Sequence, residues 1–260
     1  MALFEELFAI IAPVFIVASL GIWWGRTKKP FDTQFITQIS LTVGSPCLAF
    51  SALTKYDLPI AALGEFMLAN VLTVLFAAGI GYAILSARKL SPNAYLPSLM
   101  FANGGNLGLP LSLFAFGEAG LAYGICFFAA NSIGNFTIGQ ALASGKLTFG
   151  SIARSPVVWA VAAALAFIAL GIKPPRFVAN TTQLLGQVSI PLMLLTLGHS
   201  LARLKVASLQ RSLWLSLVRL GVGFAGGVLV AWALDLGPIA RGVLILQASM
   251  PVAVYNYLFS

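Results

Sequence analysis

Charged residues, and the side chains that usually build enzyme or metal sites, are scarce in this sequence. Only 8% of its 260 residues are charged, and it has one histidine and two cysteines. Its residues do not form a suitable Ser-His-acid catalytic triad, and the sequence has neither a paired-aspartate motif nor an HExxH motif. We therefore expect neither an enzyme nor a bound metal or cofactor. Cys47 and Cys126 lie in apolar runs, which favours small packing residues over a disulfide.

Hydrophobic residues, by contrast, are abundant. They make up 59% of the chain and recur along its entire length. This composition is typical of polytopic membrane proteins that lie in a lipid bilayer. Met1 is followed by Glu5 and Glu6 rather than by a basic segment, so we do not expect a cleavable signal peptide. The net charge of +8 comes from basic residues in short loops, without a basic patch interleaved with aromatics, so no nucleic acid partner is expected.

The apolar runs predict the number and direction of the membrane spans. A spanning helix needs about 20 mostly apolar residues. With the N-terminus outside, ten Lys and Arg residues lie in inward loops and four in outward loops, which is the asymmetry of cytoplasmic loops. We therefore predict a multi-pass protein of the inner (cytoplasmic) membrane with its N-terminus outside and nine spans, at 7–24, 36–54, 61–85, 92–117, 119–143, 155–171, 178–201, 211–233 and 238–259.

The two halves of the sequence resemble each other. A shift of 145 residues places Pro46 opposite Pro191, together with other matching positions. Because this offset covers five helices, the second copy enters the membrane upside down, as in the inverted repeats of secondary transporters. We predict a first repeat of spans one to five over 1–143 and a second repeat over 144–260. The repeat requires a tenth span near 264–288, so the sequence is expected to be a shortened member or to lack its last helix.

The fourth predicted span has its poorest helix formers at its centre, in the stretch NGGNLGLP. In hydrocarbon, an interrupted helix is tolerated only where it faces protein or a water-filled cavity. Glycine permits unwound backbone, and proline fits the first turn of a new helix. We predict one half-helix that ends near Ala102 and another that starts near Leu107. The alternative is that glycine and proline only kink a packed helix and that the amides join neighbouring helices.

The ninth span carries a matching interruption, in the stretch QASMPVAVYNYLF. Two broken helices at equivalent positions are expected to cross, so that the N-termini of their second halves meet near the bilayer midplane and favour an anion. Amides can donate hydrogen bonds to a carboxylate without adding a buried charge. The predicted substrate-binding residues are Asn103, Gly104, Gly105, Asn106, Pro110, Asn131, Asn135, Gln247, Ser249, Pro251 and Asn256.

Two of these amides and two proline motifs leave more than one interpretation. Asn131 and Asn135 lie four residues apart on one helix face, where they either line the cavity or hydrogen-bond to other helices. The prolines of spans two and seven should bend their helices and support the crossing. The residues predicted to have this supporting role are Ser45, Pro46 and Pro191.

The titratable residues within the predicted spans are also open to two interpretations each. His199 fits the C-terminal end of a helix or a role in proton coupling. Arg219 is a functional intramembrane charge or snorkels toward the cytoplasmic surface. Glu65 lies near the outer end of span three, at a different depth, so we do not pair it with Arg219.

These motifs resemble the auxin efflux carrier family. The resemblance rests on NGGNLGLPL in span four, SP in span two, SIPLMLLTLG in span seven and ASMPVAVYNY in span nine, and it extends over essentially the whole chain. Bacterial members are permeases for malate, malonate and related organic acids. The resemblance implies a ten-helix inverted repeat similar to bile acid/sodium symporters, with spans 1, 2, 6 and 7 as a scaffold and spans 3–5, 8 and 9 as a transport domain. It also implies a substrate site at Asn103 to Pro110 and Ser249 to Asn256, whereas the missing tenth helix departs from the family pattern.

The sequence therefore predicts an all-α polytopic membrane protein with an inverted five-helix repeat and crossed broken helices. Its expected function is secondary transport of a small organic anion, a dicarboxylate or another carboxylate, by elevator-type alternating access. Uniport driven by the membrane potential fits the sparse charge best, and sodium-coupled symport is an alternative. From a different class, a non-transporting membrane sensor or partner subunit is the competing prediction, and a homodimer through the scaffold helices is the expected assembly.

Overall fold

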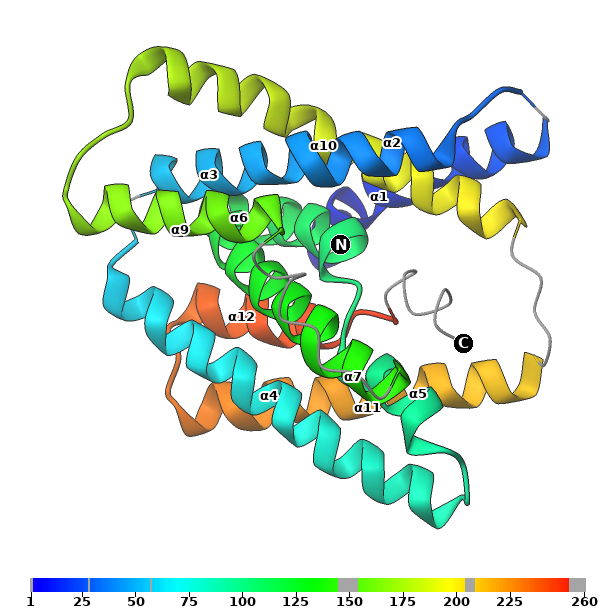
Figure 1. Ribbon diagram of the computed structural model, residues 1–260. Helices are drawn as coiled ribbons and strands as arrows, with labels where there is room; N and C mark the ends of the chain where they lie inside the picture. The colour runs from blue at the N-terminus through cyan, green and yellow to red at the C-terminus, as the bar shows by residue number, and fades with distance from the viewer. Residues whose placement is uncertain (1, 28, 57, 145–153, 204–208, 253–260) are drawn as a thin grey trace. The chain divides into compact units, whose positions relative to one another are not determined.

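The computed structural model describes residues 2–27, 29–56, 58–144, 154–203 and 209–252. These residues form helices joined by short connectors, and the β structure among them is one isolated antiparallel bridge (Figure 1). The chain divides into two compact units, and each unit is built from three separate parts of the sequence. The first unit contains 1–60, 105–125 and 155–205, and the second contains 61–104, 126–154 and 206–260.

The first unit is organised around the long helix α10 (Arg176–Arg203), which packs against α1 (Ala2–Arg26) and α3 (Ser45–Lys55). Helix α9 (Pro156–Ala169) packs against α3. Gly198 allows α1 and α10 to approach closely, because a Cβ at this position would overlap the backbone carbonyl of Ala18. Small residues at such contacts are common in membrane helix pairs, where close backbone packing replaces the hydrophobic drive for association.

Two prolines are each preceded by a π-helical turn. Helix α2 (Thr33–Ile39) continues through η1 (Ser40–Gly44) into α3, and η2 (Gly104–Gly108) continues into α6 (Leu109–Gly134). Pro46 and Pro110 each lie two residues after the end of a π turn. A proline ring clashes with the carbonyl four residues earlier, and the wider π turn relieves this clash without ending the helix. Helix α10, by contrast, runs through Pro191 without interruption.

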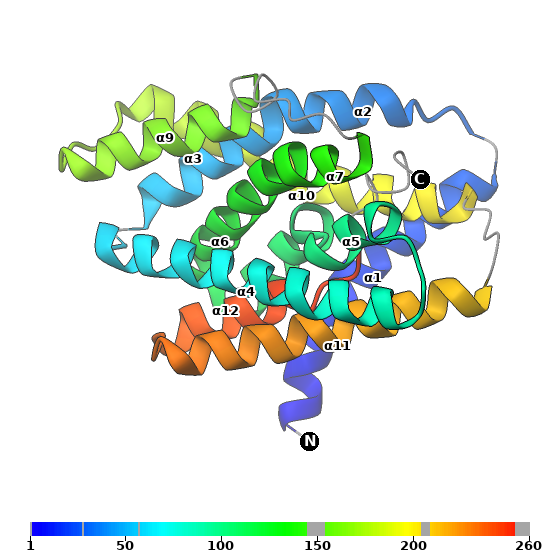
Figure 2. The ribbon, with the colours of Figure 1, turned by 60° about the horizontal axis from the view of Figure 1, so that its bottom comes forward.

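The second unit contains α4 (Ile60–Ala87), α5 (Pro92–Met100), the later part of α6, η3 (Asn135–Gly139), α7 (Gln140–Ser144), α11 (Leu209–Ala233) and α12 (Pro238–Ala248). Helices α11 and α12 lie side by side in both ribbon views (Figure 2), and α11 also packs against α5. A buried apolar cluster at the end of α4 and along α5 forms part of the core of this unit. Its members are Leu85, Leu96, Leu99, Met100 and Phe101.

The helices have the length and surface of membrane spans. Among the described residues, six helical segments are long and apolar enough to cross a bilayer, and two shorter apolar helices are α9 and α12. Large apolar side chains face outward, including Phe4 at 75% and Trp232 at 63% exposure, as expected for contact with lipid. The chain is therefore a multi-pass helical membrane protein.

One of the six segments, Gly104–Leu142, covers 39 residues, and in length it corresponds to more than one predicted span. A helix of this length would extend roughly 60 Å, about twice the thickness of the hydrocarbon core. Gly117 has a non-helical backbone with φ of 66° and divides α6 at this point. The break lies where the sequence predicts a turn between spans four and five, while the count of nine spans stays a prediction.

Candidate functional site

The first interruption lies between α5 and η2. Helix α5 ends at Met100, and Phe101 has extended backbone with φ of −106° and ψ of 119°. The last turn closes with a 3.0 Å hydrogen bond from Phe101 N to Pro97 O. Helical turns resume at Gly104, earlier than the predicted start near Leu107. The extended segment is therefore only three residues long, Phe101 to Asn103.

The second interruption follows α12, which ends at Ala248. Ser249 caps the end, since its hydroxyl donates a 2.6 Å hydrogen bond to Ile245 O. Pro251 has no N–H to continue the helix, and Val252 is extended and joins the β bridge. The helix therefore stops where the sequence predicts a break.

The two extended segments bind each other through the backbone, within the second unit. Asn103 N donates a hydrogen bond of 2.8 Å to Pro251 O, and Ala102 and Val252 form an antiparallel bridge. An unwound backbone in a bilayer must satisfy its polar groups within the protein. This pairing satisfies some of them and holds the two interruptions together.

Gly104 lies tightly against both α12 and α6. A Cβ on Gly104 would be 3.0 Å from Gln247 Oε1 and 3.3 Å from Phe127 Cδ1. Gln247 is fully buried, and Asn103 is 5% exposed. The structure therefore brings the amide of Gln247, from the last turn of α12, next to the point where η2 begins.

A stripe on α6 faces the first extended segment. Phe127 lies beside Gly104, and Gly134 lies against Phe101, since a Cβ on Gly134 would be 2.7 Å from Phe101 Cε1. Asn131 lies between these two contacts on the same helix face, because residues i, i+4 and i+7 align on one side of a helix. The Asn131 side chain is buried, and neither of its amide atoms has a hydrogen-bond partner among the described residues. Asn131 is therefore a buried polar group with unused hydrogen-bonding capacity near the two interruptions.

The remaining predicted site residues fall in several places. Asn135 is half-buried in η3 of the second unit, and Ser249 is half-buried at the α12 cap. The residues that belong to the first unit are Gly105, Asn106, Pro110, Ser45, Pro46 and Pro191. Asn256 lies outside the described residues.

Sequence reasoning missed Asn70 on α4, which is 1% exposed. Its Nδ2 donates a 3.3 Å hydrogen bond to the carbonyl of Phe127, and its Oδ1 has no partner in the part of the chain that the structure describes. The signal was available, since a lone asparagine in an otherwise apolar span is costly unless it has a partner. Asn70 therefore joins the polar groups near Phe127.

Arg219 and His199 are both buried. Arg219 is 3% exposed, which argues against snorkelling, and it lies on α11 in the second unit. His199 lies on α10 in the first unit, with its Nδ1 3.0 Å from Thr33 Oγ1 and its ring stacked on Phe31 at 4.4 Å. These contacts fix His199 against the start of α2. The sequence-based choice between a structural and a proton-coupling role for His199 stays open.

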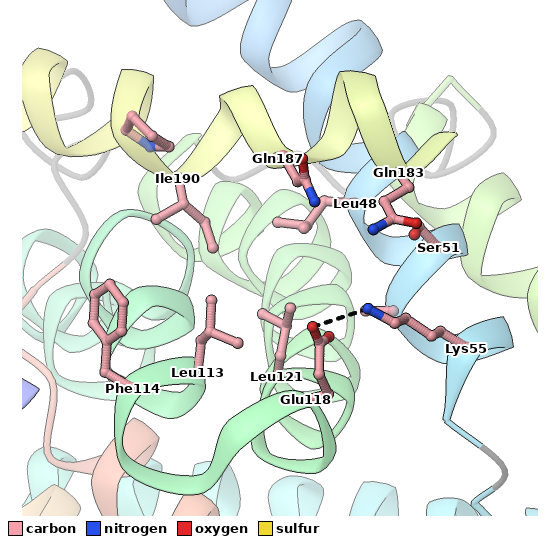
Figure 3. A pocket seen from close by; sticks show the side chains of 12 residues that line it. Leu48, Ser51, Lys55, Leu113, Phe114, Glu118, Leu121, Gln183, Gln187 and Ile190 are labelled. Atoms are coloured by element: carbon pink, nitrogen blue, oxygen red, sulfur yellow. Dashed lines mark hydrogen bonds and ion pairs between the residues drawn. The ribbon is translucent and has the colours of Figure 1, made fainter. Parts of the chain in front are cut away.

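The first unit contains a separate cavity of about 280 Å³, between α3, the first part of α6 and α10 (Figure 3). The close-up shows Gln183 and Gln187 on the α10 side of the cavity, with Leu113 and Leu121 of α6 on the opposite side. Beside them, Lys55 Nζ and Glu118 Oε1 form an ion pair of 3.2 Å, and both side chains are about half exposed. Sequence reasoning did not identify this cavity, because its polar residues come from helices far apart in the chain. The cavity is therefore lined by amide and charged side chains on one part of its wall and by apolar side chains on the rest.

No group of three or more His, Cys, Asp or Glu side chains that could hold a metal ion occurs within the described ranges. The polar groups at the crossing are amides, hydroxyls and backbone, which bind by hydrogen bonds. The fold and the site therefore define a helical membrane protein with paired interrupted helices, the arrangement typical of secondary transporters.

Comparison with known proteins agrees with this class. Residues 141–260 match the model of a family described as membrane transport protein. The matched region includes α11, α12 and the second interruption, and the match supports a membrane transporter. None of the curated proteins compared with the chain matches it.

Proposed function

We propose that this chain is a secondary transporter that moves a small organic anion, a dicarboxylate or another carboxylate, across the cytoplasmic membrane. The observation that carries the proposal is the 2.8 Å hydrogen bond from Asn103 N to Pro251 O, which joins two interrupted helices. Transporter sites are typically built from such interruptions, where half-helix ends face substrate and coupling ions. The match of residues 141–260 to membrane transport proteins supports the same class.

The donors around the crossing support an anionic substrate. Asn131 is buried without a hydrogen-bond partner among the described residues, on the face of α6 that contacts Phe101 and Gly104. An amide N–H₂ can donate to a carboxylate at a lower desolvation cost than a buried charge. In this proposal Asn131, with Asn103 and Gln247, contacts the substrate, and malate and malonate are the substrates to test first.

The proposed mechanism is elevator-type alternating access, in which the second unit carries the substrate and the first unit is the scaffold. The composition of the two units supports this division. The first unit contains α1, α3, α9 and α10, which come from predicted spans one, two, six and seven, and it also contains the start of α6. A homodimer through these scaffold helices, an outside N-terminus and uniport driven by the membrane potential complete the proposal.

Reconstitution of the purified chain in proteoliposomes tests the function. We expect uptake of labelled malate or malonate that responds to an imposed membrane potential and is unchanged when sodium is replaced by choline. Sodium dependence would favour symport instead. Absence of flux for a panel of organic anions, together with a melting temperature that none of them changes, would refute transport. Binding without flux would favour the sensor or partner subunit.

A further inference from the structure

Arg219 is a buried cation on α11, a helix with one exposed face and another face packed against α5 and α12. Its neighbours on α11 include Leu217 at 67% and Leu220 at 38% exposure, whereas Arg219 is 3% exposed. Its side chain therefore enters the interior of the second unit. A charge at membrane depth is costly and in most cases marks a substrate path, an ion path or a buried counter-charge.

The second unit offers Arg219 no acidic partner. Its acidic residues are Glu65 and Asp235. Glu65 is exposed on α4, and Asp235 is paired with Arg241 at 3.2 Å on the surface. Arg219 Nε is buried and has no hydrogen-bond partner in the part of the chain that the structure describes. Within the described part of the second unit, the guanidinium therefore has no acidic side chain as its counter-charge.

The Arg219 side chain lies beside the C-terminal end of α12, where the second interruption begins. A Cβ on Gly223 would be 2.5 Å from Arg219 Nη1 and would overlap the carbonyl oxygen of Ala248. The guanidinium and the last carbonyl of α12 therefore share the space that glycine leaves free. Ala248 comes three residues before Pro251, whose carbonyl accepts from Asn103.

The helix end compensates only part of the arginine charge. The C-terminus of a helix carries roughly half a negative charge, spread over its last free carbonyls. One of these carbonyls is already occupied, since Ser249 Oγ donates to Ile245 O. A full positive charge therefore remains only partly neutralised in a low-dielectric interior.

We propose that Arg219 is a substrate-binding residue whose guanidinium pairs with a carboxylate of the transported anion at the interruption after α12. This inference rests on the proposed function and extends it, because it names the residue that selects a negatively charged substrate. A guanidinium binds a carboxylate through two parallel hydrogen bonds, which an ammonium cannot reproduce. The anion then supplies the counter-charge that the second unit lacks.

Binding of labelled malonate to purified Arg219→Gln and Arg219→Lys tests the proposal. We expect Arg219→Gln to weaken binding by roughly 10- to 100-fold, the usual effect of losing a charge-assisted hydrogen bond. The affinity of Arg219→Lys for malonate should lie between those of the wild type and Arg219→Gln, since lysine keeps the positive charge and loses the two parallel donors of the guanidinium. The matched control is Arg241→Gln, which removes a surface-paired arginine of the same unit and should bind malonate as the wild type does.

A measurement on the wild type keeps the proposal testable if both variants fail to fold. Solid-state NMR with carboxyl-¹³C malonate and guanidinium-¹⁵N arginine should show dipolar coupling to a guanidinium whose protons exchange slowly with water, as expected for the buried Arg219. Coupling only to fast-exchanging guanidinium groups, or none, would overturn the proposal, as would wild-type affinity in Arg219→Gln. A wild type that neither binds nor transports any anion of the panel would instead refute the proposed function.

Discussion

Replacement of Asn131 by leucine distinguishes a substrate-binding role of this side chain from a packing role, because the two roles predict stability changes of opposite sign. The Asn131 side chain is 5% exposed, and neither amide atom has a partner among the described residues. A buried polar group without a partner costs about 1–3 kcal/mol. Leucine has the same number and branching of side-chain heavy atoms as asparagine and no polar atoms, so Asn131→Leu should stabilise the protein by about 2 kcal/mol. For a chain of this length the melting temperature should rise by roughly 4–8 °C.

Thermal unfolding followed by tryptophan fluorescence in detergent measures this shift, with and without malonate. Thr73→Val is the matched control in the same unit, because Thr73 is also buried but its hydroxyl donates a 2.8 Å hydrogen bond to Ala69 O. Loss of that bond should lower stability by about 1 kcal/mol. The two variants should therefore shift the melting temperature in opposite directions.

Malonate completes the test. In the wild type we expect malonate to raise the melting temperature, and in Asn131→Leu this effect should be much smaller, since the variant lacks the amide donor. A lower melting temperature for Asn131→Leu would refute the reasoning, because it would mean that the amide joins helices. A stabilised variant with the full malonate effect would show that Asn131 does not contact the anion.

Three further predictions concern the rest of the chain. Gly198→Ala should lower stability by about 1–3 kcal/mol in thermal unfolding, because the added methyl overlaps α1, whereas Gly64→Ala, with nothing within 4 Å of the added carbon, should not. A double-mutant cycle on Lys55 and Glu118 should give a coupling below about 1 kcal/mol, since the pair is half exposed. Asn103→Leu should abolish malonate binding and leave membrane insertion intact, as measured by binding and by fractionation, and wild-type binding would contradict the site.

The places where helices stop could be predicted from the sequence, because they depend on local chemistry. Pro251 removes a donor from the backbone, whatever surrounds it. The glycines after Asn103 indicate the place of the first interruption, although they lie in the helical turns of η2, directly after the extended segment. The structure has interruptions at both places. The return of helical turns at Gly104 could not be predicted as well, since it depends on packing against Gln247 and Phe127.

The cavity of the first unit shows a different limit. Gln183 and Gln187 lie one turn apart on α10, so their shared face follows from the sequence. Their meeting with Lys55 and Glu118 does not, because it requires knowing which faces of α3, α6 and α10 pack together. A single sequence shows the period of an apolar helix poorly when almost every position is apolar, and thus the inward face of such a helix is known only from the fold.

The polar residues of this chain that call for a functional explanation are those that are buried and have no partner among the described residues. Arg241 and Lys55 carry the same charge as Arg219, yet each has an acidic partner near the surface and needs no other explanation. Arg219 and Asn131 are at most 5% exposed, and the described residues offer their buried Nε and amide atoms no hydrogen-bond partner. Each would make the second unit less stable than an apolar residue would, and both lie beside segments that the two interruptions bring together. In the proposed site the transported anion is the partner of both residues, and this links the cost of the two residues to a single function.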